Sequence, residues 1–227
     1  MRKLFRWAGA FLFILSLASF VVVYVWRLGT PAPGSDGTLA DAITNVVLFT
    51  IFALHHSIMA RTGAKAWLIR RLPAELERSV YVWIASLLFL AVCWMWQPLP
   101  GVVWELHGPG VLLHLVQLVG AALTIAGARV VGLWELAGVR QPDLARPVEF
   151  TATGPFGIVR HPIYFGWVLM VFATPTMTSS QLLFAVVSTA YLVAAIPLEE
   201  RSLVEAFGDK YRAYQTAMRW RLVPFIW

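Results

Sequence analysis

The chain has 227 residues, of which 59% are hydrophobic and only 13% are Asp, Glu, Lys or Arg. A soluble globular domain usually carries about twice that charged share, and the mean hydropathy of +0.70 agrees with this deficit. The composition excludes an ordinary water-soluble protein and predicts an integral membrane protein that folds as one membrane domain over residues 1–227. The single cysteine, Cys93, cannot build a disulfide framework or a thiolate metal cluster, and we expect no metal site.

Uncharged stretches predict the membrane spans. Because roughly 20 apolar residues cross a bilayer as a helix, four of these stretches predict one helix each. The last stretch, 161–198, is too long for one crossing and is interrupted at 173–180, which we interpret as a turn. The fold class is therefore an all-α integral membrane protein with about six transmembrane helices and a C-terminal interfacial helix; a five-span arrangement is the less favoured alternative. The expected spans are about 5–26, 40–60, 79–97, 111–134, 162–176 and 181–198.

Basic residues are concentrated in every second loop, and this distribution predicts the orientation of the protein in the membrane. Lys and Arg gather in the N-terminus, in the segments after the second and fourth spans, and in the tail, whereas the other loops contain only Arg27. Since cytoplasmic loops are enriched in Lys and Arg, we expect a multi-pass protein of the inner (plasma) membrane with both termini in the cytoplasm. The net charge of +6 is placed in these loops, so we expect contact with membrane lipid and no nucleic-acid partner.

Two adjacent histidines, His55 and His56, end the second predicted span just before Arg61. A helical rise of about 1.5 Å per residue places them roughly 7–9 Å inside the membrane edge. Polar side chains at membrane depth are often functional. The alternative interpretation is that one or both hydrogen-bond a neighbouring helix.

A dense polar motif precedes the fifth predicted span. Gly154-Pro-Phe-Gly-Ile-Val-Arg160-His161-Pro162-Ile-Tyr164 leads directly into the uncharged stretch. Pro162 suits the first turn of a helix, where its missing N–H is no loss. The free N–H groups of that helix end, with Arg160 and His161, predict a site for a carboxylate or another anion.

Two carboxylates, Glu199 and Glu200, follow the sixth predicted span. They could bind ribose hydroxyls or a cation, and the alternative is that they form salt bridges to Arg201 or Arg160. An apolar and aromatic stripe at helical spacing follows and predicts the interfacial helix. Its members are Leu203, Phe207, Tyr211 and Tyr214.

Two other classes of protein find little support. A bis-histidine haem needs two histidines at one depth, whereas His114 is expected near the outer side, opposite His55 and His56. A transporter would be expected to show an inverted repeat or paired broken helices, and neither is visible in the sequence.

The motifs at 154–166 and 199–214 together resemble the isoprenylcysteine carboxyl methyltransferase and phospholipid methyltransferase superfamily, over about residues 150–224. The resemblance implies an S-adenosylmethionine pocket at the cytoplasmic face, roofed by the C-terminal helix. The residues that would line it are Gly154, Arg160, His161, Tyr164, Glu199 and Glu200.

Further segments resemble the methanethiol S-methyltransferase and NnrU-like branch of that superfamily: 56–61, 77–82 and 175–178. That branch commonly has Gln where this chain has His55, and a histidine where this chain has Gly132 or Leu133.

The resemblance implies an S-adenosylmethionine-dependent methyltransferase that acts on a small or lipid-like acceptor, either a thiol or a carboxylate. Methyl transfer from a sulfonium is an in-line displacement, so an oriented pocket matters more than a covalent protein nucleophile. His55 or His56 could deprotonate a thiol, and Arg160 could favour an anionic acceptor. These three residues are the catalytic candidates. The alternative function is a non-catalytic NnrU-like membrane protein that supports nitrogen-oxide metabolism.

Overall fold

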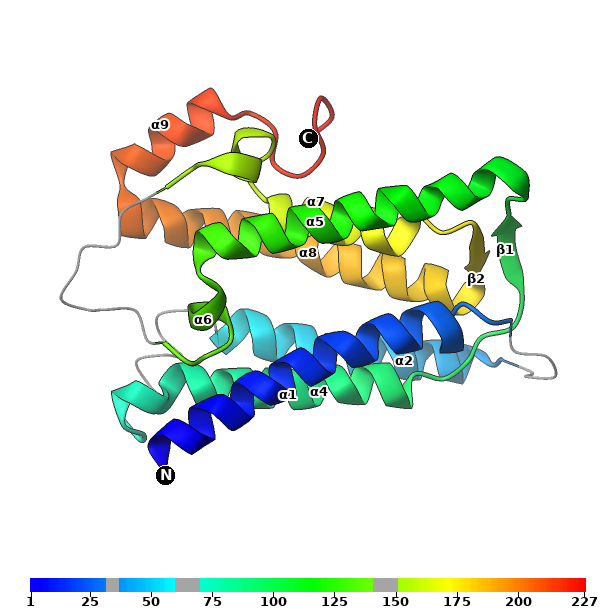
Figure 1. Ribbon diagram of the computed structural model, residues 1–227, viewed down its shortest axis with the longest axis horizontal. Coiled ribbons are helices and arrows are strands. Elements are labelled where there is room, and N and C mark those ends of the chain that lie inside the picture. The colour runs from blue at the N-terminus through cyan, green and yellow to red at the C-terminus, as the bar shows by residue number, and fades with distance from the viewer. Residues whose placement is uncertain (32–36, 60–69, 141–150) are drawn as a thin grey trace. The chain divides into compact units, whose positions relative to one another are not determined.

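The computed structural model describes residues 1–31, 37–59, 70–140 and 151–227. The described chain is mostly helical, with two short strands (Figure 1). Three of the basic loop residues on which the predicted orientation depends lie outside the described residues: Arg61, Lys65 and Arg146. The chain divides into two compact units, which we describe separately. Unit 1 comprises Met1–Trp104, Leu133–Pro142 and Thr176–Val187, and unit 2 comprises Glu105–Gly132, Asp143–Pro175 and Ser188–Trp227.

Unit 1 is built on three long apolar helices. They are α1 (Arg2–Val22), which continues as the π-helical turn η1 (Val23–Arg27), α2 (Leu39–Met59) and α4 (Glu77–Met95). The unit also contains the short elements η2 (Ala74–Leu76) and α6 (Leu133–Leu136) and the first part of α8 (Ser179–Phe207), up to Val187.

An aromatic cluster forms the core of unit 1. Phe184, which is 1% exposed, lies at its centre. Its ring centroid is 5.2–5.6 Å from those of four other aromatic residues, a spacing typical of favourable ring contacts. These four are Phe20, Tyr24, Phe49 and Trp96.

Backbone polar groups at and just after the end of α4 form hydrogen bonds with side chains from other segments. The guanidinium of Arg27 donates to the carbonyls of Trp94 at 2.6 Å and Trp96 at 3.2 Å. The buried Asn45 exchanges two hydrogen bonds with the backbone of Gln97, at 2.8 and 2.7 Å. Since the last carbonyls of a helix lack intrahelical donors, and unpaired polar groups are costly inside a membrane, these contacts stabilise this end of α4.

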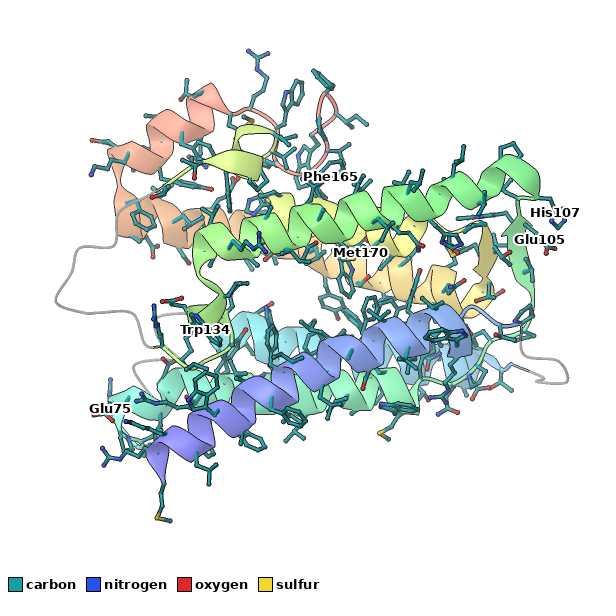
Figure 2. All side chains as sticks on the ribbon, in the orientation of Figure 1. Glu75, Glu105, His107, Trp134, Phe165 and Met170 are labelled. Atoms are coloured by element: carbon teal, nitrogen blue, oxygen red, sulfur yellow. The ribbon has the colours of Figure 1, made fainter. Side chains whose placement is uncertain are left out.

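Unit 2 is organised by close packing of α5 (Leu113–Val131) against α7 (Pro162–Phe172). Gly120 and Gly166 face each other, and a Cβ built on Gly120 would be 2.6 Å from the carbonyl oxygen of Gly166. Small residues at membrane-helix interfaces allow this approach of two backbones. The unit also contains η3 (Gly108–Leu112), η4 (Gly154–Gly157), the later part of α8 (Ser179–Phe207) and α9 (Asp209–Ala217). Figure 2 shows Glu105 and His107 at the η3 end of α5.

The described helices match most of the predicted spans. Five are long and apolar enough to cross a membrane: Arg2–Arg27, Leu39–Met59, Glu77–Met95, Gly108–Val131 and Ser179–Phe207. The helix within the predicted span 162–176 differs, because α7 has only 11 residues. At about 1.5 Å per residue, this is roughly half of the hydrocarbon thickness. A helix follows the last span, as predicted; it is α9, and Gly208 with φ 56° separates it from α8.

Two other features differ from the predictions. Residues expected in loops form β1 (Val102–Glu105) and β2 (Thr176–Thr178), which pair in a small sheet. Both strands contain β-branched residues, which favour extended backbone. The other difference is that α8 continues past Pro197 to Phe207, so the carboxylates Glu199 and Glu200 lie within this helix instead of following it.

The close contact between α5 and α7 leaves no room for a side chain at Gly166. A Cβ on Gly166 would collide with the carbonyl oxygen of Gly120 and with Thr124. We expect Gly166→Ala to destabilise the protein by about 1–3 kcal/mol, as overpacking does elsewhere, and to lower the thermal unfolding midpoint in detergent. Gly157→Ala is the matched control, because nothing lies within 4 Å of its Cβ position. Equal midpoints for the two variants would contradict this account of the packing.

Candidate active site

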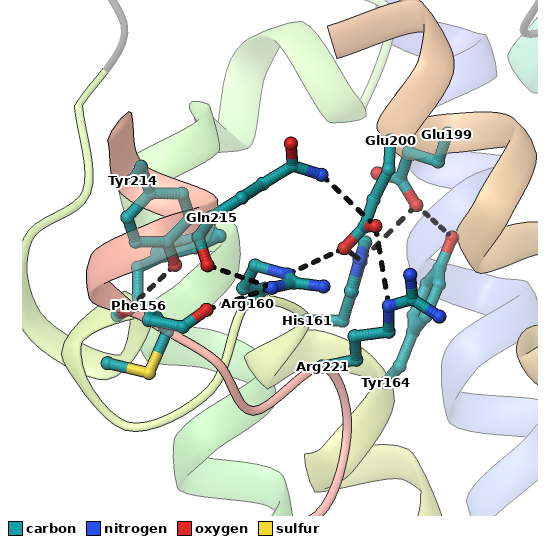
Figure 3. Close-up of polar contacts among 10 residues, drawn as sticks. Phe156, Arg160, His161, Tyr164, Glu199, Glu200, Tyr214, Gln215 and Arg221 are labelled. Atoms are coloured by element: carbon teal, nitrogen blue, oxygen red, sulfur yellow. Dashed lines mark hydrogen bonds and ion pairs between the residues drawn. The ribbon is translucent and has the colours of Figure 1, made fainter. Parts of the chain in front are cut away.

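Five predicted site residues of unit 2 gather where α7 begins and α8 passes (Figure 3). Arg160 and His161 immediately precede the Pro162 turn, and Tyr164 lies in the first turn of α7. Glu199 and Glu200 are supplied by α8. The two sequence motifs, about 40 residues apart in the chain, therefore meet in space.

Glu200 is the centre of this cluster. Its side chain is 6% exposed, and its Oε1 accepts hydrogen bonds from Nε of Arg160 at 2.7 Å and Nε2 of His161 at 3.3 Å. Its Oε2 accepts from Nε2 of Gln215 at 3.3 Å and is 3.5 Å from Nε of Arg221. A buried charge needs such partners to offset its desolvation. Because an ionised carboxylate only accepts hydrogen bonds, Nε2 of His161 must carry a proton.

Arg160 connects this carboxylate to the end of α9. The residue is 7% exposed, and its Nη1 donates to the carbonyls of Met218 at 2.9 Å and Gln215 at 3.3 Å. Nη2 has no hydrogen-bond partner among the described residues. The alternative interpretation of the acidic pair, a salt bridge to Arg160, is thus realised by Glu200.

The backbone N–H groups of the two residues just before α7 are paired within the protein. Those of Arg160 and His161 donate to the carbonyls of Trp220 at 2.8 Å and Arg221 at 2.9 Å. These two groups are therefore not free for an anion, because the chain returns to this point after α9. Sequence patterns did not predict this pairing, since it joins segments that are distant along the chain.

Glu199 is the more accessible of the two carboxylates. Its side chain is 44% exposed, and its Oε2 accepts a hydrogen bond from the Tyr164 hydroxyl at 2.8 Å. The ring of His161 stacks on that of Tyr164, with centroids 5.4 Å apart. Glu199 therefore has room to accept hydrogen bonds from a ligand, whereas Glu200 is committed to partners within the protein.

A cavity of about 420 Å³ opens beside Glu200. This volume is in the range of small-molecule sites, about 300–1,000 Å³. It is lined by Pro197, Glu200, Arg201, Val204, Glu205, Gln215 and Arg221. Sequence analysis did not single out Gln215 or Arg221. Gln215 lies four residues after the buried Tyr211. Because residues four apart share one face of a helix, this spacing was the only sequence signal that could have placed Gln215 near the site.

The α9 helix and η4 are fixed to each other by a tyrosine. The hydroxyl of Tyr214 donates to the carbonyl of Phe156 at 2.7 Å. Burial raises the pKa of Tyr214 to about 12 and raises the pKa of Tyr211 above its usual range. Both phenols therefore remain protonated at neutral pH, and Tyr214 keeps its donor. Gly154 begins η4 with φ 60°, a left-handed backbone conformation that favours glycine.

His55 and His56 lie in unit 1, on α2, where Tyr81 of α4 touches both rings. The Tyr81 hydroxyl is 2.8 Å from Nδ1 of His56. The ring of His55 stacks on that of Tyr81, with centroids 5.9 Å apart. Both ring nitrogens of His55 are buried and have no hydrogen-bond partner among the described residues. Hydrogen bonding to a neighbouring helix thus accounts for His56 but not for His55.

Comparisons with known proteins agree with the motifs. The phospholipid methyltransferase family matches residues 110–210. Methanethiol S-methyltransferase 1 of Bradyrhizobium diazoefficiens is 37% identical over 94% of this chain and 82% of its own length. Methanethiol S-methyltransferase of Mycobacterium tuberculosis is 36% identical over 92% of this chain and 90% of its own. Nurim of Rattus norvegicus is more distant, at 28% identity over 73% of this chain and 69% of its own.

No solved structure shows a significant match to the chain. The high coverage of both the chain and its bacterial relatives nevertheless establishes its family, and confirms the resemblance predicted from the motifs at 154–166 and 199–214. The chain belongs to the family of membrane methyltransferases that includes the methanethiol S-methyltransferases.

Proposed function

We propose that the protein transfers a methyl group from S-adenosylmethionine to a small thiol of the methanethiol class. The observation that carries the proposal is the meeting of the two family motifs at Glu200. The bacterial relatives named for methanethiol favour a thiol over the carboxylate that the motifs left open. The basic loops favour a donor site on the cytoplasmic face of the inner membrane.

The donor site is assigned to the Glu200 cluster and its cavity. S-adenosylmethionine supplies an electrophilic methyl group on a sulfonium. The exposed carboxylate of Glu199 suits ribose hydroxyls or an ammonium group, because it can accept hydrogen bonds in addition to that from Tyr164. The Nη2 group of Arg160 suits a carboxylate. Glu200 and His161 hold these two side chains in place, and Gly154 shapes the η4 turn beside α9.

The acceptor thiol has to be activated by the protein before it can react. A thiol is nucleophilic as its thiolate, so a base must take its proton or a cation must favour the anion. We assign to His55 the role of the base that takes the proton of the thiol, because both of its ring nitrogens lack partners among the described residues. His56 is bound to Tyr81 and is assigned to positioning. Arg160 adds positive charge on the donor side.

The direct test combines ligand binding with product analysis. S-adenosylhomocysteine should bind the detergent-purified protein saturably in calorimetry, and methanethiol with S-adenosylmethionine should yield dimethyl sulfide by gas chromatography. Binding without methylation of any small thiol would refute the acceptor. A folded protein that binds no S-adenosylhomocysteine would refute the methyltransferase proposal itself.

The two carboxylates should respond differently to substitution. Glu200→Gln leaves the buried Arg160 without its charge partner, and breaking such a pair typically costs about 3–5 kcal/mol. We expect a lower unfolding midpoint together with loss of S-adenosylhomocysteine binding. Glu199→Gln should keep the wild-type midpoint, because Glu199 is half exposed, and should weaken binding alone.

Asp209→Asn is the control for a change of charge, since Asp209 has a 96% exposed side chain on α9. It should alter neither the midpoint nor the binding. If Glu199→Gln bound S-adenosylhomocysteine as tightly as this control, its assignment to the donor site would fail.

His55→Ala should produce a pH-dependent defect. We expect unchanged S-adenosylhomocysteine binding and a fall in methyl transfer at neutral pH of about 10²–10⁴-fold, the usual contribution of a general base. The rate should recover as pH rises, because the thiolate fraction of the free thiol grows about tenfold per pH unit below its pKa. The ring of His55 stacks on Tyr81, and His56 is its neighbour in the chain.

His56→Ala is the comparison variant for this experiment. Because His56 already has a hydrogen-bond partner, its loss should give a smaller defect without recovery at high pH. A His55→Ala enzyme with the wild-type rate and pH profile would show that His55 is not the base.

A further inference from the structure

The chain after α9 forms a compact loop, residues 220–227, which we call the hook. It closes on itself through the N–H groups of Leu222 and Val223, which donate to the carbonyl of Trp227 at 2.8 and 3.0 Å. Trp227 in turn donates to the carbonyl of Val223 at 3.1 Å. The buried Leu222 fixes the hook to unit 2. Figure 1 shows the hook as the closed loop marked C.

The tip of the hook exposes two large apolar side chains. Phe225 is 85% exposed and Ile226 is 78% exposed. Phe225 has φ 66° and is the one non-glycine residue with positive φ in the described part of the chain. This conformation is disfavoured for residues with a side chain, so the fold holds Phe225 in a strained backbone conformation. Backbone outliers of this kind are often functional.

The position of the hook relative to the bilayer follows from its backbone pairing. Trp220 and Arg221 accept hydrogen bonds from the N–H groups of Arg160 and His161. The uncharged stretch 161–198 begins at that point, which marks the edge of the hydrocarbon region. The hook therefore starts at the membrane edge.

The groups beside the tip are those found at membrane interfaces. The ring of Trp220 is 5.6 Å from that of Phe225, and the guanidinium of Arg221 is 5.4 Å from the ring of Trp227. Arg219 is exposed next to them. A cavity of about 460 Å³ with both apolar and cationic lining, including Ile158, Met218, Trp220, Phe225 and Arg219, borders the hook. Aromatic rings prefer the headgroup level, and arginine is attracted to anionic lipid.

We propose that the hook is an interfacial anchor, which inserts Phe225 and Ile226 among the lipids of an anionic leaflet while Arg219 meets the headgroup phosphates. The partner is thus a lipid surface. This role is separate from methyl transfer. It explains why a strained loop presents adjacent apolar side chains outside the long membrane-crossing helices.

The test places a fluorescent reporter on the hook. Ile226→Cys in a Cys93→Ala background carries an environment-sensitive label, and Ala213→Cys on the exposed surface of α9 is the matched control. Both proteins are reconstituted in nanodiscs that contain phosphatidylglycerol. S-adenosylhomocysteine binding and the thermal midpoint in detergent report whether each labelled protein is folded.

We expect the Ile226 label to be about threefold or more better protected from aqueous acrylamide than the Ala213 label, because interfacial side chains leave water. It should also be quenched by spin labels near the headgroup end of the acyl chains. Protection should decrease in phosphatidylcholine nanodiscs and in an Arg219→Gln variant.

Three outcomes would overturn the proposal. Equal acrylamide quenching at the two positions would show that the tip remains in water. Protection without quenching by the lipid-borne spin labels would show that protein, such as a second copy, covers it. Equal protection in phosphatidylcholine and phosphatidylglycerol would show that anionic headgroups do not contribute.

Discussion

The compensation of one buried negative charge constrains three segments of unit 2 at once. Removing a carboxylate from water is strongly unfavourable unless donors replace the solvent. Glu200 obtains these donors from Arg160 and His161 before α7, from Gln215 on α9 and from Arg221 in the hook. Each of these segments is therefore constrained by the same side chain. Loss of Glu200 would disturb the start of α7, α9 and the hook together, because all three depend on one pair of carboxylate oxygens.

This constraint also separates the roles of neighbouring residues. Successive residues of a helix point in directions about 100° apart, so Glu199 and Glu200 cannot occupy the same environment. Glu200 faces its internal donors, and Glu199 keeps an exposed side chain that is oriented by Tyr164. A pair of identical residues thus yields one structural carboxylate and one carboxylate available to a ligand.

The adjacent histidines of unit 1 are separated in the same way. His56 reaches the hydroxyl of Tyr81, whereas His55 only stacks on the ring of Tyr81. The buried nitrogens of His55 remain without partners among the described residues. Since buried polar groups are usually hydrogen-bonded, His55 is the more chemically available of the two.

The sequence by itself determined the membrane class, the approximate positions of five long helices and the family. These properties depend on local information, namely the length of uncharged runs and the identity of residues in short motifs. Tertiary structure decided the pairing of Glu200 with Gln215 and Arg221, the use of the N–H groups at Arg160 and His161, and the partner of His56. It also decided the shortness of α7 and the strand pair, because these features require contacts between segments that no local pattern relates.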